Sequence, residues 1–257
     1  MEQQIGIHDV TAPSAWFPAN LEALSHRFER LSPYDVLRWA LVTCGDDVAL
    51  ATGFGASGVA LMHMVSRIRP GSTFFFLQTD LLFPETMALR DRLAKRLPIQ
   101  FVEVPASITL QDQGRRYGPE LWRHNPDLCC RLRKVESLHR FLSGRRAWVS
   151  AIRRDQSPTR SQIAVVAWDY ANGLLKIAPL ATWSRKEVWD YIREHKLPYN
   201  PLHDQGYPSI GCFPCTQAVG PDAQERDGRW AGRSKLECGI HAEPQCNQTY
   251  RQQLRPS

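Results

Sequence analysis

The sequence predicts an α/β protein in which a parallel sheet carries helices on both faces and a loop-rich segment follows. Short apolar runs alternate with longer patterns of helical spacing, which is typical of parallel strands joined by crossover helices. From Leu197 onward, prolines and glycines interrupt the chain repeatedly, so we expect few regular elements there. These two observations predict the α/β fold class without reference to any motif.

The expected elements follow one another in a simple order. Apolar residues at helical spacing predict two helices between Asn20 and Cys44, the second starting at Ser32-Pro33. The predicted strands after them are 47–52, 72–77, 99–104 and 145–152, and the predicted helices are 59–68, 84–96 and 129–142. Residues 107–127 are polar and broken by glycine and proline, which indicates a long loop with one short helix.

Two local signals organise the chain after residue 160. Runs at 165–169 and 174–177 flank Asn172-Gly173, and this pairing predicts a β-hairpin. Ser184 followed by Glu187 forms a capping box, so a helix is expected over 185–195.

Length and composition narrow the class of protein. The chain has 257 residues, enough for one large α/β domain or two small ones, with 43% hydrophobic and 23% charged residues. No apolar run is long enough to span a bilayer, and the amino terminus lacks the basic flank and apolar core of a signal peptide. We therefore expect a cytoplasmic protein without a membrane partner, where paired cysteines usually bind metals or carry redox chemistry.

The formal net charge of +6 permits several anionic partners. Nucleic acid, a small polyanionic substrate and an acidic protein all fit such a charge. The basic residues are dispersed rather than gathered in a tract, so nucleic acid is not the favoured partner.

A glycine-rich turn joins the first predicted strand to the next helix. Its sequence is Gly53-Phe54-Gly55-Ala56-Ser57-Gly58. Glycines let backbone N–H groups approach an anion, and the helix N-terminus adds partial positive charge. No Gly-Lys-Ser/Thr follows, so the turn is not a Walker A loop. A plain tight turn remains the alternative.

A basic loop follows the strand at 145–152. It runs from Arg153 to Arg160 and includes Arg154. Arginine binds phosphate and sulfate oxygens in bidentate fashion, although a solvated basic loop is the alternative. In a parallel sheet, ligands bind at the carboxyl ends of the strands, where this loop, the glycine turn and Gln78–Asp80 all lie.

Four cysteines could complete a soft metal centre. Cys129-Cys130 and Cys212-Phe213-Pro214-Cys215 offer four thiolates, suited to zinc or to an iron–sulfur cluster. Adjacent helical residues point about 100° apart, and the separate irons of a cubane accept diverging thiolates more easily than one zinc ion does. We therefore favour a [4Fe–4S] cluster. Lys134, one turn after Cys130, is expected to face the cluster or a neighbouring anion, with a surface lysine as the alternative.

Cys238 is the candidate nucleophile. Thiolate is the reactive form of cysteine, and nearby positive charge favours it. Arg229, Arg233, Lys235 and His241 supply such charge close by in sequence. A spare metal ligand or a buried thiol is the alternative. The remaining cysteines, expected to take no part in chemistry, are Cys44 and Cys246.

Together these motifs resemble the assimilatory adenylylsulfate (APS) reductases, the iron–sulfur form of the PAPS/APS reductase family. The resemblance is carried by the two cysteine pairs, Glu237-Cys-Gly-Ile-His241, the 153–160 loop, the glycine turn and Leu82–Thr86. It extends from about residue 47 to 241. Three units are expected: a helical cap at 1–46, a nucleotide-binding and iron–sulfur reductase domain at 47–220, and a mobile segment carrying the catalytic cysteine at 221–257.

The resemblance implies an adenine nucleotide α-hydrolase-like fold with a modified phosphate-binding loop. It also implies a reaction in which Cys238 attacks the sulfur of adenylyl sulfate, AMP leaves and an S-sulfocysteine forms. A thioredoxin or glutaredoxin-like reductant then releases sulfite. The residues implied to bind the substrate are Gly53, Phe54, Gly55, Ser57, Gly58, Lys134, Arg154, Arg160, Arg229 and His241. The implied cluster ligands are Cys129, Cys130, Cys212 and Cys215.

The chain departs from the family pattern in two places. Gln78-Thr79-Asp80 stands where the family usually has Asp-Thr-Gly, a change that bears on the adenine and ribose contacts, and Ala151 replaces a common glycine. PAPS reductases generally lack the four cluster cysteines, so their presence favours adenylyl sulfate. A PAPS or dual-specificity reductase is the first alternative. A zinc-stabilised tRNA-modifying or nucleic-acid-binding protein on the same nucleotide fold is the second.

Overall fold

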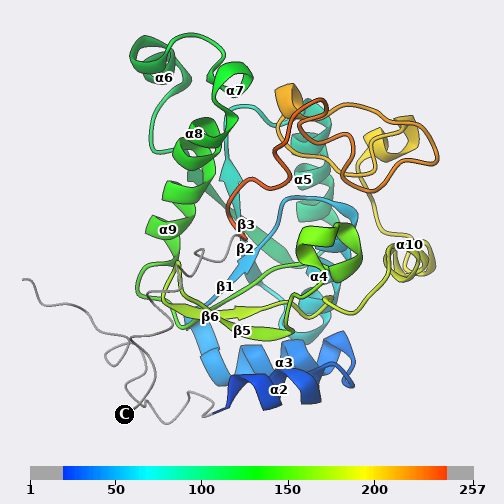
Figure 1. The fold of residues 1–257 in the computed structure, drawn as a ribbon. Coiled ribbons are helices and arrows are strands. Elements are labelled where there is room, and N and C mark those ends of the chain that lie inside the picture. Colours follow the sequence, from blue (N-terminus) through cyan, green and yellow to red (C-terminus); the bar gives the residue numbers. More distant parts are fainter. Residues whose placement is uncertain (1–19, 242–257) are drawn as a thin grey trace, which may run out of the picture.

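The computed structural model describes residues 20–241, and within them six strands form one sheet in the order β3-β2-β1-β4-β6-β5 (Figure 1). All neighbouring strands run parallel except β5, which is antiparallel to β6. The strands are β1 Val48–Ala51, β2 Ser72–Gln78, β3 Ile99–Pro105, β4 Ala147–Val149, β5 Val166–Asp169 and β6 Leu174–Ile177. The predicted parallel sheet and the 165–177 hairpin are confirmed.

The central strands of the sheet are buried on both faces, as their apolar residues require. Alternate residues of a strand point to opposite faces, so Phe74 and Phe76 of β2 enter one core while Phe75 enters another. Trp148 of β4 lies with Phe75 in the second core. The near-continuous hydrophobic runs of the sequence therefore reflect two cores on either side of one sheet.

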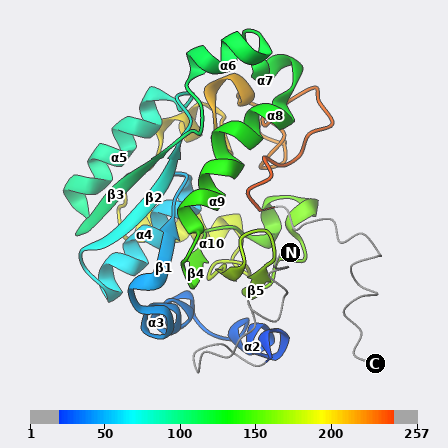
Figure 2. The ribbon, with the colours of Figure 1, turned by 90° about the vertical axis from the view of Figure 1, so that its left-hand side faces the viewer.

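Helices cover the two faces unequally (Figure 2). The larger core contains side chains of α3 (Pro33–Cys44), α4 (Ala56–Ile68), α5 (Pro84–Arg96) and α10 (Arg185–Glu194). The second core is closed by α9 (Glu136–Leu142) through Leu138 and Leu142. Helices on both faces are therefore confirmed.

The helix boundaries follow the expected capping chemistry. Ser32 caps α3, with Pro33 in its first turn, and Pro84 opens α5 in the same way. The Ser184–Glu187 capping box opens α10 as predicted. Cys44 closes α3 and is buried, which confirms the interpretation of this cysteine as a packing residue.

The helix bearing the vicinal cysteines begins earlier than predicted. Asn125 caps it and Pro126 occupies its first position, so α8 runs Pro126–Cys130 and places both cysteines at the end of its first turn. A π-helical turn, Arg131–Val135, then leads into α9. π-Turns inside helices often occur at functional sites. The preceding region also holds two short helices rather than one, α6 (Leu110–Tyr117) and α7 (Leu121–His124).

The amino-terminal helices share the main core with the sheet. Leu24 and Phe28 of α2 (Leu21–Phe28) pack in the same cluster as β1 and β2, and α2 lies against β5. The division at residue 46 therefore stays a prediction, as does the one at residue 220. The remaining short elements are 3₁₀ turns at Gly45–Asp47, Arg154–Gln156, Pro158–Arg160, Pro201–Gln205 and Phe213–Cys215.

Residues 221–241 contain neither helix nor strand, whereas residues 242–257, with Cys246, lie outside the described part of the chain. Across residues 20–241, none of the helices combines the length and the apolar character needed to cross a membrane.

A half-buried histidine at the α4–α10 contact gives the fold a pH dependence. His63 Nδ1 lies 2.7 Å from the Tyr191 hydroxyl, which in turn lies 2.8 Å from that of Tyr34. Burial, reinforced by His195 and two nearby arginines, lowers the pKa of His63 to about 4. The unfolded chain, with a pKa of about 6.5, takes up the proton first as the pH falls. Stability is thus lost as the pH falls from about 6.5 to about 4.

We expect the thermal midpoint of the wild type to fall more steeply over this interval than that of His63→Gln. Differential scanning calorimetry at several pH values measures both curves. His26→Gln is the control, because His26 is an exposed residue of α2. Parallel curves for wild type and His63→Gln would contradict the assignment.

Candidate active site

A cavity of about 250 Å³ lies at the carboxyl ends of β1, β2 and β4. Thr52 follows β1, Thr79 follows β2 and Ser150 follows β4, and all three line it. The glycine turn, the arginine loop and the segment from Cys238 to His241 complete its wall. The sheet therefore brings together motifs that are far apart in sequence, at the edge where ligands of parallel sheets bind.

The glycine turn presents backbone rather than side chains to the cavity. Gly53, Gly55, Ser57 and Gly58 line it, and α4 starts with Gly55 as an N-cap that makes no side-chain capping bond. The first N–H groups of α4 therefore suit an anionic ligand.

Phe54 and Ser57 of the glycine turn were expected to bind substrate, but their side chains contact other parts of the protein. Phe54 lines the cavity, but its ring packs edge-on against Phe76, with ring centroids 5.1 Å apart. The Ser57 hydroxyl accepts a hydrogen bond from the Arg153 guanidinium. Phe54 thus anchors the turn to the core, and Ser57 orients an arginine.

Arg153, not Arg154, faces the cavity, which corrects the expectation from the sequence. Arg153 is only 2% exposed and pairs with Asp155 at 2.9 Å and Glu225 at 2.6 Å. Arg154 turns away to Glu29, the residue that caps the end of α2, at 2.5 Å and does not line the cavity. The backbone at Arg153 is extended, so consecutive side chains point in opposite directions.

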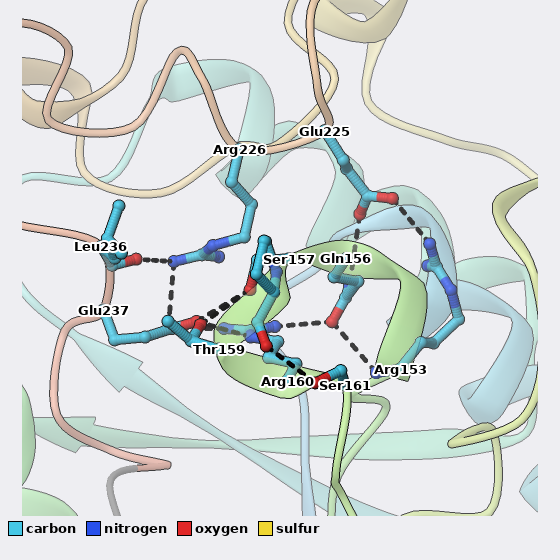
Figure 3. A network of polar contacts seen from close by, with 11 residues as sticks. Arg153, Gln156, Ser157, Thr159, Arg160, Ser161, Glu225, Arg226, Leu236 and Glu237 are labelled. Carbon is cyan, nitrogen blue, oxygen red and sulfur yellow. Dashed lines mark hydrogen bonds and ion pairs between the residues drawn. The ribbon is translucent and has the colours of Figure 1, made fainter.

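Arg160 and Arg226 line the cavity and hold the residue next to the candidate nucleophile (Figure 3). Arg160 binds Glu237 through two bonds of 2.7 Å, and Arg226 donates to the same carboxylate at 3.0 Å. Burial opposes ionisation, but the two arginines hold the pKa of Glu237 below its ordinary value. Arg226 was not foreseen, because no pattern in the loop-rich sequence distinguishes it.

Cys238 lies half-buried at the cavity beside Lys134 and Arg229. Burial would raise its pKa, but the Lys134 ammonium, the Ile240 N–H and Arg229 together lower it. Lys235, which the sequence suggested as a source of positive charge for Cys238, instead pairs with Asp127 and lies over the Trp230 ring at 5.3 Å. The foremost activating cation, Lys134, thus comes from the π-turn after Cys130, and Arg229 is the one neighbour in sequence that also lowers the pKa of Cys238.

The backbone after Cys238 depends on glycine. Gly239 has a φ of +94°, and an added Cβ would lie 3.2 Å from Val135 of the π-turn. The Cys-Gly-Ile-His motif thus lets the chain turn sharply against the cysteine-bearing helix.

His241 is neutral in this site rather than a source of positive charge. Its ring stacks on Trp148 with centroids 5.4 Å apart, and burial together with nearby cations lowers its pKa well below the ordinary value. The side chain lines the cavity, as expected, and offers an uncharged ring nitrogen there.

The four predicted ligand cysteines share a second, smaller cavity. Burial raises the pKa of Cys129 to about 11 and that of Cys130 to about 12, and it raises that of Cys215 as well. These thiols would release protons on binding a metal. The Cys212 sulfur lies 3.3 Å from the Thr79 hydroxyl. Within residues 20–241, no three histidine, cysteine or acidic side chains converge closely enough to hold one metal ion.

Lys134 and Arg229 line both cavities and so form the wall between them. Burial acts against the charge of Lys134, but Cys212 and Cys238 raise its pKa, so the ammonium is retained. The prediction that Lys134 faces both the cysteine centre and a neighbouring anion site thus has a geometric basis.

The departure at Gln78-Thr79-Asp80 affects the cysteine helix rather than the cavity. Neither Gln78 nor Asp80 lines the cavity. Asp80 adopts a φ of +56°, a conformation that favours glycine, and its carboxylate pairs with the buried Arg133. Arg133 also donates to the Thr79 carbonyl at 2.5 Å. Asp80 therefore ties the carboxyl end of β2 to the helix that carries Cys129-Cys130.

Unpaired polar atoms converge on the cavity. Among the described residues, five buried side-chain atoms without a partner belong to residues that line it: Ser150 Oγ, His203 Nε2, Arg226 Nε, Arg229 Nε and His241 Nδ1. Buried polar groups are normally hydrogen-bonded, so this concentration indicates a polar ligand. Ser150 and His203 carried no sequence signal.

The absence of a side chain at Gly211 makes room for the guanidinium of Arg229. A Cβ at Gly211 would overlap the guanidinium of Arg229, whereas one at Gly220 would meet nothing within 4 Å. We expect Gly211→Ala to fold normally, because the end of a flexible side chain can move, but to weaken binding of an anionic nucleotide about tenfold. Calorimetric titration of the variant measures this, with Gly220→Ala as control. Unchanged affinity in Gly211→Ala would show that Arg229 does not bind the anion.

The fold and the site define an adenine nucleotide α-hydrolase-like protein with a thiol at its cavity. A crystal structure of phosphoadenylyl-sulfate reductase from Candida auris, in complex with phosphate, superposes with a TM-score of 0.66 at 30% identity, covering 77% of this chain and 96% of that chain. Yeast FAD synthetase in complex with FAD superposes with a TM-score of 0.51 at 14% identity, which is a likeness of fold alone.

Sequence comparison places the chain more narrowly. Residues 47–218 match the model of the phosphoadenosine phosphosulfate reductase domain. An adenosine 5'-phosphosulfate reductase of Salinibacter ruber is 50% identical over 90% of this chain and 92% of its own length. A phosphoadenosine 5'-phosphosulfate reductase of Gloeobacter violaceus is 48% identical over 86% of this chain and 93% of its own length. The chain therefore belongs to the phosphoadenosine phosphosulfate reductase family.

Proposed function

We propose that this protein reduces adenylyl sulfate to sulfite and AMP in assimilatory sulfate reduction, through an S-sulfocysteine on Cys238. The observation that carries the proposal is the position of Cys238: it lines the cavity at the carboxyl ends of the strands, beside Lys134 and Arg229, which lower its pKa. A family member with an activated thiol at this place suits attack on the sulfur of a nucleotide sulfate.

In the first step the Cys238 thiolate attacks the sulfur of adenylyl sulfate. The bond from that sulfur to the bridging oxygen breaks, and AMP leaves with the electron pair. Negative charge grows on the departing phosphate, and Lys134, Arg226 and Arg229 line the cavity where it would develop. The N–H groups at the start of α4 would bind the same phosphate.

In the second step a dithiol reductant of the thioredoxin or glutaredoxin type regenerates the enzyme. One thiolate of the reductant attacks the Cys238 sulfur, and sulfite leaves with the electrons of the sulfur–sulfur bond. The second thiol of the reductant resolves the mixed disulfide and frees Cys238. Overall, adenylyl sulfate and a dithiol give AMP, sulfite, a disulfide and two protons. A cytoplasmic location belongs to the same proposal.

Cys129, Cys130, Cys212 and Cys215 would hold a [4Fe–4S] cluster. Four thiols and no other ligand type line their shared cavity beside three cations, Arg133, Lys134 and Arg229, a donor set that fits an anionic iron–sulfur centre. Each thiolate of a cubane binds a different iron, so the sulfurs need not converge on one point as they do around zinc. When bound, the cluster would contribute electrostatics and rigidity near Lys134.

Reduction of 3'-phosphoadenylyl sulfate is the second candidate, since the Gloeobacter violaceus relative carries that name. The four ligand cysteines favour the unphosphorylated nucleotide in this chain.

The test uses anaerobically purified protein mixed with each nucleotide in the absence of reductant. Mass spectrometry of the digested protein is expected to find a sulfo adduct on the Cys238 peptide, formed faster from adenylyl sulfate. Faster reaction of the 3'-phosphorylated nucleotide would favour the second candidate. No adduct with either, on protein that contains zinc instead of iron and sulfide, would overturn the reductase proposal and favour a zinc-stabilised nucleic-acid-binding protein.

A further inference from the structure

Glu237, the residue before Cys238, is bound by several side chains at once (Figure 3). Arg160 binds both of its oxygens at 2.7 Å, Arg226 donates to one at 3.0 Å and the Thr159 hydroxyl donates at 3.1 Å. Arg226 also donates to the Leu236 carbonyl at 2.9 Å. One carboxylate thus gathers donors from the arginine loop and from the loop-rich segment.

The chain leading to Glu237 has one other side-chain anchor, Lys235, which pairs with Asp127 and lies over the Trp230 ring. Residues 231–234 and Leu236 are exposed, and none of 231–241 lies in a helix or strand. Glu237 itself is only 20% exposed on its side chain. Bidentate arginine–carboxylate pairs are among the stronger and more directional polar contacts in proteins. Glu237 therefore holds the chain on the amino-terminal side of Cys238, whereas Ile240 and His241 pack against the second core and Trp148 on the other side.

We propose that Glu237 is a positioning residue that latches the Cys238 segment over the cavity. While the Glu237 carboxylate is bound by Arg160 and Arg226, the thiol faces the cavity and is only half open to solvent. When these ion pairs break, the segment lifts and the Cys238 sulfur becomes accessible to a reagent as large as a protein.

The test compares how fast a small and a bulky maleimide modify Cys238. The variants are Glu237→Gln, which keeps the shape but loses the charge, and Glu237→Asp, which keeps the charge on a shorter arm. All are made in a Cys246→Ser background, so that the 236–251 tryptic peptide reports one thiol. Removing the charge also changes the thiolate fraction, but it does so equally for both reagents, so the ratio of the two rates reports access.

We expect Glu237→Gln to raise the bulky-to-small rate ratio at least tenfold and Glu237→Asp to raise it less. The matched control is Glu29→Gln, which breaks the 2.5 Å pair with Arg154 of the same loop, outside the cavity. An unchanged ratio in Glu237→Gln overturns the proposal. So does an equal rise in Glu29→Gln, because that would reflect general loosening of the arginine loop.

A second readout rests on the proposed function. Glu237→Gln should form the sulfo adduct more slowly, because the thiol is less well placed. Thioredoxin should nevertheless release sulfite from the preformed adduct of this variant faster. A loss in both half-reactions would argue against a latch. The maleimide experiment uses no nucleotide, so its result does not depend on the proposed function. A failure of the latch and a failure of the reductase activity can therefore be told apart.

Discussion

Replacing Cys238 by serine is expected to abolish sulfite release from adenylyl sulfate while leaving the iron and sulfide content unchanged. A serine hydroxyl stays protonated at neutral pH, even beside Lys134 and Arg229, and cannot replace a thiolate whose pKa those cations lower. Cys238 does not line the small cavity that the four other cysteines share. Anaerobic assay of sulfite and chemical analysis of iron measure the two quantities on one preparation.

The control for this substitution is Cys44→Ser. Cys44 is 1% exposed at the end of α3, and burial raises the pKa of its thiol to about 11, so it takes no part in the chemistry. Its replacement should retain the catalytic rate. Loss of iron from Cys238→Ser would instead identify Cys238 as a metal ligand and break the separation between nucleophile and cluster.

Replacing Lys134 by methionine is expected to slow adduct formation about 100-fold, the usual cost of removing one preorganised donor from a charged transition state. Lys134 is the foremost group lowering the pKa of Cys238. Because thiolate is the reactive form, the pH midpoint for alkylation of Cys238 should lie below that of an ordinary cysteine thiol in the wild type and move upward in Lys134→Met.

Single-turnover mass spectrometry and the pH profile of iodoacetamide modification measure both effects of Lys134→Met. Lys186→Met removes an equal charge from the surface of α10, where Lys186 pairs with Asp190 at 2.6 Å, and should change neither quantity. Rates are compared per iron, since Lys134 also lines the cysteine cavity. A normal rate in Lys134→Met would assign charge stabilisation to Arg226 and Arg229 instead.

Much of the fold could be predicted because local signals and global structure agree. The apolar runs, the Ser184–Glu187 capping box and the prolines opening α3 and α5 each determine an element directly. The π-turn after Cys130 could not be predicted, because it depends on how that helix packs rather than on residue preference.

A site residue could be predicted where its spacing from a recognised motif along one helix was enough to place it. Lys134 was found because one helical turn separates it from Cys130. The choice between Arg153 and Arg154 was missed, because it depends on the direction in which an extended backbone leaves β4. Arg226 and His203 were missed because their segments have no regular period, so only tertiary contacts bring them to the cavity.

The pairing of Asp80 with Arg133 makes two positions of this chain energetically interdependent. Removing Asp80 leaves a buried guanidinium without its counter-charge, whereas removing Arg133 leaves an aspartate in a left-handed conformation with nothing to offset its strain. Losses at two such positions do not add. Glycine at position 80 is therefore compatible with the backbone but incompatible with this particular arginine, so the two residues are constrained to change together.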